Sequence, residues 1–160
     1  MAATFQFSQS NGAGQTKTDI GDGSGGNFWN FKNADTATPS DYATYPITAG
    51  NRSYDVWIQG HFTGTFNNIS NIKFWCSTLS LTGYGTGALI SGDKEIPGAY
   101  VTPSTADTTE PNVPVAEGSA LALAYGAAFS DYVQLQLETG ADATPGDGGT
   151  STFTLKYDES

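Results

Sequence analysis

The sequence predicts an all-β protein, a jelly-roll-like antiparallel β-sandwich with long loops and an extended N-terminal arm. Apolar and polar residues alternate over residues 54–66, 132–138 and 152–157, which is the period of a strand with one buried face. Glycine and proline separate such stretches, and almost no segment has the 3.6-residue period of a helix. Many short strands between turns are typical of two packed antiparallel sheets.

Residues 1–26 are predicted to form a flexible N-terminal arm or linker. Residues 2–8 alternate, with Phe5 and Phe7 on one face, and could be a short edge strand or an extended arm. The glycine-rich stretch at residues 8–26 offers little apolar surface to a core. We expect this arm to grip a neighbouring subunit, so deleting residues 2–20 should leave a folded domain that associates less well. Residues 27–160 then form a single β-sandwich domain.

A long strand is predicted over residues 54–66, where the apolar side chains fall on even positions and the polar ones mostly on odd positions. Gly60 and Gly64 lie in the apolar row, which suggests a bend, a bulge or close sheet packing. A further alternating row follows at residues 72–76. Residues 54–76 are therefore predicted to form a hairpin or a corner.

The signal weakens between residues 77 and 130. Leu79 and Leu81 are predicted to extend a strand, and further strands are expected near residues 99–101 and 113–115. Residues 119–129 contain Ala and Leu that would suit a helix, but their short length, Gly118 and Gly126 favour a strand and turn.

The C-terminal region is predicted to be a hairpin of strands 132–138 and 152–157. Residues 139–149 between them show no periodicity and are too many for a tight turn, so we expect a surface loop. The predicted core consists of the apolar rows of all these strands: Val56, Ile58, Phe62, Ile72, Phe74, Val133, Leu135, Leu137, Phe153 and Leu155.

Composition limits the classes of partner. The formal net charge is −10, with only six Lys and Arg, so the chain lacks the clustered cations that nucleic acid binding needs. No apolar run approaches the roughly 18 residues of a membrane span, and we expect neither a membrane partner nor a secretory signal. Cys76 is the single cysteine, so no disulfide forms within the chain.

No catalytic residue, cofactor or metal site is predicted. His61 is the only histidine and lies on the polar side of its strand, without a G-x-S-x-G nucleophile motif elsewhere. Residues 21–26 match G-x-G-x-x-G, but no strand precedes them and no helix follows. Four loop carboxylates lack the spacing of a calcium loop and are interpreted as solvated turn residues: Asp19, Asp22, Asp142 and Asp147.

Five aromatic residues are the candidates for protein contact. Trp57 and Trp75 each occupy the polar row of a strand, where an indole is either covered by a second layer or exposed to a partner or a sugar; we favour coverage. Trp29 belongs to a cluster with Phe28 and Phe31 that is predicted to be a buried strand or anchor. The candidates are Phe5, Phe7, Trp29, Trp57 and Trp75.

Residues 131–159, with Pro-Gly-Asp-Gly-Gly at 145–149, resemble the endings of small virion structural proteins of tailed bacteriophages, and residues 68–75 are similar in style. The resemblance implies a non-enzymatic capsid decoration (cement) or minor head protein, or a tail component, of jelly-roll type. It further implies a homotrimer that contacts a major capsid protein. Such a protein is made in the host cytoplasm and resides in the virion.

A carbohydrate-binding, lectin-like module is the main alternative. Such modules also use β-sandwiches that carry aromatic platforms, and fold alone does not separate the two classes. An enzyme has no positive support among the residues.

Overall fold

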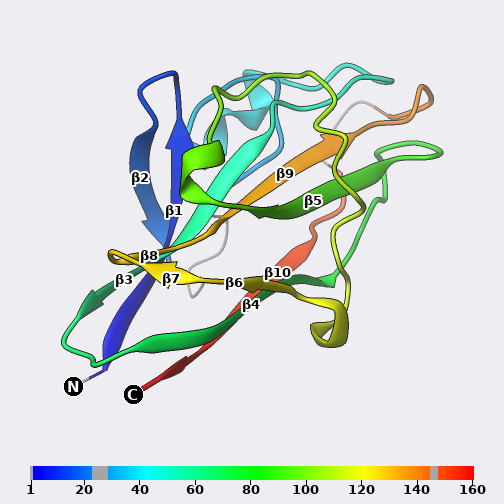
Figure 1. Ribbon diagram of the computed structural model, residues 1–160. Helices are drawn as coiled ribbons and strands as arrows, with labels where there is room; N and C mark the ends of the chain where they lie inside the picture. Colours follow the sequence, from blue (N-terminus) through cyan, green and yellow to red (C-terminus); the bar gives the residue numbers. More distant parts are fainter. Residues whose placement is uncertain (1, 23–28, 145–147) are drawn as a thin grey trace.

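The computed structural model describes residues 2–22, 29–144 and 148–160, and within them the protein is all-β (Figure 1). Three short 3₁₀ turns, η1 (Pro39–Ala43), η2 (Pro97–Ala99) and η3 (Glu117–Ser119), lie in the connections. The strands are β1 (Ala3–Asn11), β2 (Thr16–Gly21), β3 (Val56–Gly64), β4 (Ile69–Thr78), β5 (Leu89–Glu95), β6 (Leu121–Leu123), β7 (Tyr125–Gly126), β8 (Phe129–Ser130), β9 (Tyr132–Glu138) and β10 (Thr152–Glu159).

The strands form two antiparallel sheets, so the predicted all-β antiparallel architecture is confirmed. Sheet A has the order β2-β1-β3-β8-β7, and β9 joins it by pairing with both β3 and β5. Sheet B has the order β10-β4-β6. The two sheets bury their apolar rows against each other as a β-sandwich. Jelly-roll connectivity stays a prediction.

The predicted C-terminal hairpin is wrong, although both of its strands exist. Strand β9 lies in sheet A, where Leu135 stands opposite Val56, whereas β10 lies in sheet B, where Leu155 stands opposite Phe74. Strands β3 and β4 are likewise divided between the sheets, so residues 54–76 form the corner rather than the hairpin. Alternation reveals which face of a strand is buried but does not identify the neighbouring strand.

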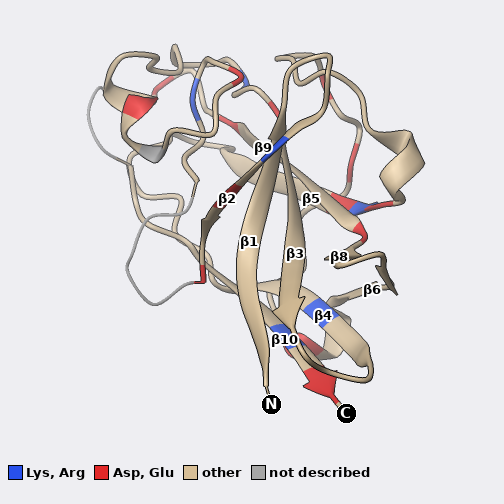
Figure 2. Cartoon of the chain, turned by 90° about the vertical axis from the view of Figure 1, so that its left-hand side faces the viewer, with Lys and Arg blue, Asp and Glu red and all other residues tan. Residues whose placement is uncertain are grey.

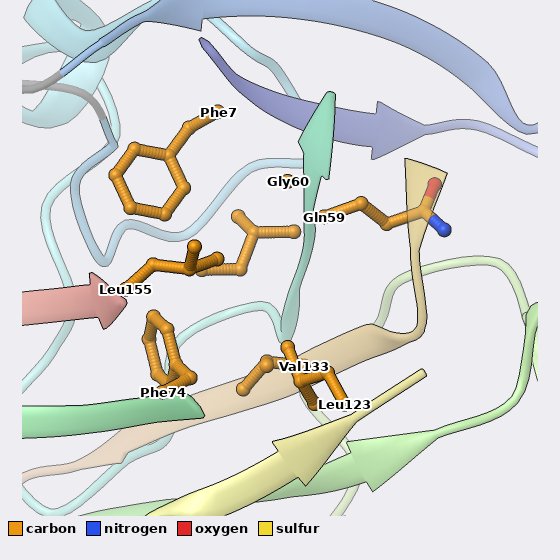
Figure 3. A pocket seen from close by; sticks show the side chains of 8 residues that line it. Phe7, Gln59, Gly60, Phe74, Leu123, Val133 and Leu155 are labelled. Atoms are coloured by element: carbon orange, nitrogen blue, oxygen red, sulfur yellow. The ribbon is translucent and has the colours of Figure 1, made fainter. Parts of the chain in front are cut away.

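The core lies between the sheets and matches the prediction closely. Eight of the ten predicted residues are buried, and Phe153 and Leu155 are partly buried against them. Figure 3 shows Phe7, Phe74 and Leu155 converging between the sheets, while the side chain of Gln59 points away. The space that these side chains enclose is too small for a water molecule. It therefore offers no room for a ligand.

Replacing Leu135 with alanine is expected to lower the free energy of unfolding by about 2–5 kcal/mol, the usual cost of a core cavity. Leu135 is only 1% exposed and packs within the core cluster. Urea titration followed by circular dichroism measures this loss. A loss below about 0.5 kcal/mol, which is typical of surface substitutions, would show that this face of β9 is not packed as described.

The flexible N-terminal arm is a wrong prediction for residues 3–21, and of the two alternatives for residues 2–8 the strand is the one that forms, although it is not an edge strand. Strand β1 pairs with β3 along residues 3–10 and with β2 on its other edge, and Phe7 is only 5% exposed. The β1–β2 turn is closed by a hydrogen bond from Gln15 N to Gly12 O, with Gly12 at a positive φ of 68°. Glycine therefore shapes a turn here. Residues 23–26 of the proposed arm lie outside the described residues.

Other local predictions had mixed outcomes. Strand β5 was not predicted, and no strand forms at residues 79–81, 99–101 or 113–115. The strand and turn expected at residues 119–129 are confirmed by β6, β7 and the start of β8. Trp29 and Phe31 pack against the core without forming a strand, and Phe28 lies outside the described residues.

Candidate functional site

Trp57 is covered, as the sequence analysis favoured. It lies on the outer face of sheet A, yet it is only 1% exposed. The rings of Tyr100 and Tyr132 pack edge-on against it, with centroids at 5.2 and 5.4 Å. Tyr100 belongs to the covering segment, residues 96–112, which crosses this face of the sheet. Trp57 is therefore part of a second, buried layer.

A buried carboxylate fastens the covering segment to sheet A. Asp55 accepts hydrogen bonds from Trp57 Nε1 at 2.5 Å, from Gln134 Nε2 at 2.8 Å and from the backbone N–H of Ser104 at 2.6 Å. Tyr100 adds a hydrogen bond from its hydroxyl to Gly12 O, at 2.8 Å. Burial raises the pKa of Tyr100 far above its ordinary value, so this hydroxyl stays protonated and donates.

Phe5, Phe7 and Trp29 also find their partners within the protomer. Phe5 packs edge-on against Phe7, with ring centroids 4.9 Å apart. Trp29 lies between Phe7 and Phe153, with centroids at 5.5 and 5.3 Å. These three side chains therefore pack in or against the core between the sheets. A contact of the three residues with another protein stays a prediction.

Trp75 is partly exposed, as Trp29 is, but it lies on the outer face of sheet B, away from the core. It is half-buried and stands opposite Thr154 of β10. No other aromatic ring of the described residues stacks on it. We call this surface the Trp75 face and define it by Lys73, Trp75, Thr154 and Lys156. Its side chains alternate with the core side chains of β4 and β10.

Two lysines stand opposite each other on the Trp75 face. Lys73 and Lys156 are direct register partners, and Figure 2 shows the basic positions of β4 and β10 side by side. Like charges directly opposite across two strands oppose folding, and these are two of only six basic residues in the chain. Lys156 pairs with Glu117 at 2.7 Å, which raises the lysine pKa and lowers that of the carboxyl. No ion pair joins Lys73 to a described residue.

His61 gains a carboxylate neighbour that the sequence did not reveal. Its Nδ1 lies 3.0 Å from Asp19, and its ring stacks on Phe129 with centroids 4.3 Å apart. Lys17 Nζ lies 3.8 Å from the centre of the same phenyl ring. Within the described residues, no nucleophilic side chain is hydrogen-bonded to the imidazole, so the geometry adds no support to a catalytic role.

Asp142, one of the loop carboxylates, accepts hydrogen bonds from another loop of the same chain. Asp142 accepts from the backbone N–H and the hydroxyl of Thr86 at 2.6 and 2.7 Å, and these hydrogen bonds lower its pKa. The two residues border an open depression of about 350 Å³ between the loops that follow β4 and β9. No group of three or more potential ligands gathers for a metal within the described ranges, and Asp147 lies outside them.

Sequence reasoning found Trp75 but missed the two lysines beside it. Their only signal was their place in the polar rows of residues 72–76 and 152–157, and the register between these strands was not predicted. No helix in the described part of the chain is long and apolar enough to cross a membrane. No family model, curated protein or solved structure matches this chain.

Proposed function

We propose that the protein is a non-enzymatic virion structural protein of a tailed bacteriophage, a capsid decoration (cement) protein of jelly-roll type. It acts by binding neighbouring protein subunits through the Trp75 face. The observation that carries this proposal is a partly exposed tryptophan with two lysines on the outer face of sheet B. The resemblance of residues 131–159 to phage virion proteins supplies the biological setting.

A partly exposed tryptophan supports a protein contact for energetic reasons. Trp is enriched among the few interface residues that carry most of the binding free energy. Trp57, its counterpart on sheet A, is fully covered by residues of the same chain, whereas Trp75 keeps part of its surface exposed. A partner that packed on the Trp75 face would bury the indole and supply anions to the lysines.

The proposed partners are other copies of the chain, in a homotrimer, and a major capsid protein. A protomer of charge −10 repels its copies, so their contact requires a surface that is not itself acidic. The Trp75 face meets this requirement because its basic residues offset the nearby Glu117. The protein would join the particle after synthesis in the host cytoplasm.

Trp75→Ala is expected to weaken self-association about tenfold or more, since an interface tryptophan often contributes above 1.4 kcal/mol. Light scattering over a micromolar concentration series measures the average molar mass of the wild type and of the Trp75→Ala variant. Tyr45→Ala is the matched control, because Tyr45 is an exposed aromatic residue in the connection between β2 and β3, outside the Trp75 face. Thermal unfolding confirms that both variants stay folded. Equal association of wild type and Trp75→Ala would contradict the proposal.

A carbohydrate-binding module is the second candidate, and the same face favours it. Thr154 Oγ1 donates to Ser77 Oγ at 2.9 Å beside Trp75, so hydroxyl groups flank an aromatic surface on which a sugar ring could stack. A wild-type chain that stays monomeric and binds a polysaccharide saturably, with binding lost in Trp75→Ala, would establish this function instead.

A further inference from the structure

Three carboxylates gather on the outer face of sheet A, beside β5. Asp93 and Glu95 stand opposite Gln134 and Tyr132 of β9, on the side of the sheet that faces away from the core. Glu110 lies next to them, because the following residue is tied to β5 by a hydrogen bond from Gly92 N to Pro111 O, at 2.8 Å. We call Asp93, Glu95 and Glu110 the acidic face.

No cation of the described residues neutralises the acidic face. Lys94 lies between Asp93 and Glu95 in sequence, but its position in the strand directs it to the opposite side of the sheet. Burial and the two neighbouring carboxylates raise the pKa of Glu110. None of the three carboxylates is in an ion pair with a described residue. The group would therefore be stabilised by a cation from outside the protomer.

The Trp75 face carries the opposite charge, in a lysine that forms no ion pair with a described residue. Lys156 is paired with Glu117, and Asp158 farther along β10 accepts a hydrogen bond from Asn71. Lys73, opposite Lys156, forms no ion pair with a described residue: Glu117 lies within electrostatic range of it but is already paired with Lys156. Within one protomer, the unpaired lysine and the unpaired carboxylates lie on the outer faces of different sheets, so they cannot reach each other.

We infer that the Trp75 face of one copy binds the acidic face of a second copy, with Lys73 directed at Asp93, Glu95 and Glu110. This inference rests on the proposed function and specifies which surface of the second copy is bound. Two different surfaces meet, so the contact is heterologous. The acidic face of the first copy and the Trp75 face of the second stay free to bind further copies. Repetition closes a ring, such as the proposed trimer, if the rotation between copies allows closure, and otherwise extends a chain.

Reversing charge on either face tests the inference. Lys73→Glu and Glu95→Lys should each weaken association about tenfold or more, because each places like charges against each other across the contact. The double variant Lys73→Glu with Glu95→Lys should recover most of the affinity, since the attraction is restored with its sign exchanged. Lys94→Glu is the control: it makes the same change in net charge as Lys73→Glu outside both faces, and it should associate as the wild type does.

Sedimentation equilibrium of the four variants and the wild type, over a micromolar range, gives the association constants. Circular dichroism verifies folding in each. Recovery in the double variant supports the heterologous contact. Single variants that weaken association without recovery, or that have no effect, overturn it while the proposed function stands. A wild type that is monomeric throughout the range contradicts the proposed assembly function itself.

Discussion

Deleting residues 2–20 is expected to abolish cooperative folding, at the cost of the whole stability of a small domain, about 5–15 kcal/mol. The deletion removes β1 and all but the last residue of β2. Strand β3 would lose the ladder along one of its two edges, and Phe7 would leave the core. The backbone groups of β3 that β1 now satisfies would face solvent along an apolar edge.

Urea titration of the deleted chain, followed by far-ultraviolet circular dichroism, measures this effect. We expect no sigmoidal transition. Thr18→Ala is the matched control, because Thr18 is exposed on edge strand β2 and its replacement should leave stability unchanged. A sigmoidal transition of wild-type steepness in the deleted chain would show that residues 2–20 are a separable arm after all.

Trp57→Ala is expected to lower the free energy of unfolding by about 3–5 kcal/mol. Trp57 is the largest fully buried side chain of the described residues. Its removal would leave a cavity beneath Tyr100 and Tyr132. Asp55 would also lose one of the hydrogen bonds that hold the covering segment. Urea titration monitored by circular dichroism gives the value, and it avoids a fluorescence signal that the substitution itself would alter.

Two further variants separate the causes of this loss. Trp57→Phe keeps an aromatic ring but removes the indole N–H, so it should cost less than Trp57→Ala. Trp75→Ala, on the exposed face of sheet B, should cost less than either of them. If Trp57→Ala and Trp75→Ala proved equally mild, the covering segment would not bury Trp57.

The elements that the sequence predicted well are those in which apolar and polar residues alternate along the strand. Strands β4 and β10 alternate cleanly, and β3 and β9 also have an apolar inner row. The second half of strand β1, beyond the alternating residues 2–8, escaped prediction because it is buried while its side chains are polar. Ser10 and Gln9 are satisfied there by Tyr132 Oη and Thr36 O, which are distant in the sequence. The pattern of apolar and polar residues gives no signal for a row of polar side chains that is buried.

The candidate site was predictable only in part, for a related reason. Trp57 and Trp75 are equivalent in sequence, since each lies in the polar row of a strand. What separates them is the covering segment, which starts about forty residues after Trp57 and reaches it only through the tertiary fold. The lysine pair depends on the register between β4 and β10, which local pattern does not specify.

The Trp75 face forms late in folding, because strands that are neighbours in the sequence lie in different sheets. The hydrogen bond between Thr154 and Ser77 joins residues 77 positions apart, so sheet B closes a long loop when β10 pairs with β4. Such non-local pairing is slow relative to local contacts. A ribosome delivers β4 well before residues 152–159. The Trp75 face is therefore among the last surfaces to form, and a nascent chain cannot recruit partners through it before synthesis reaches β10.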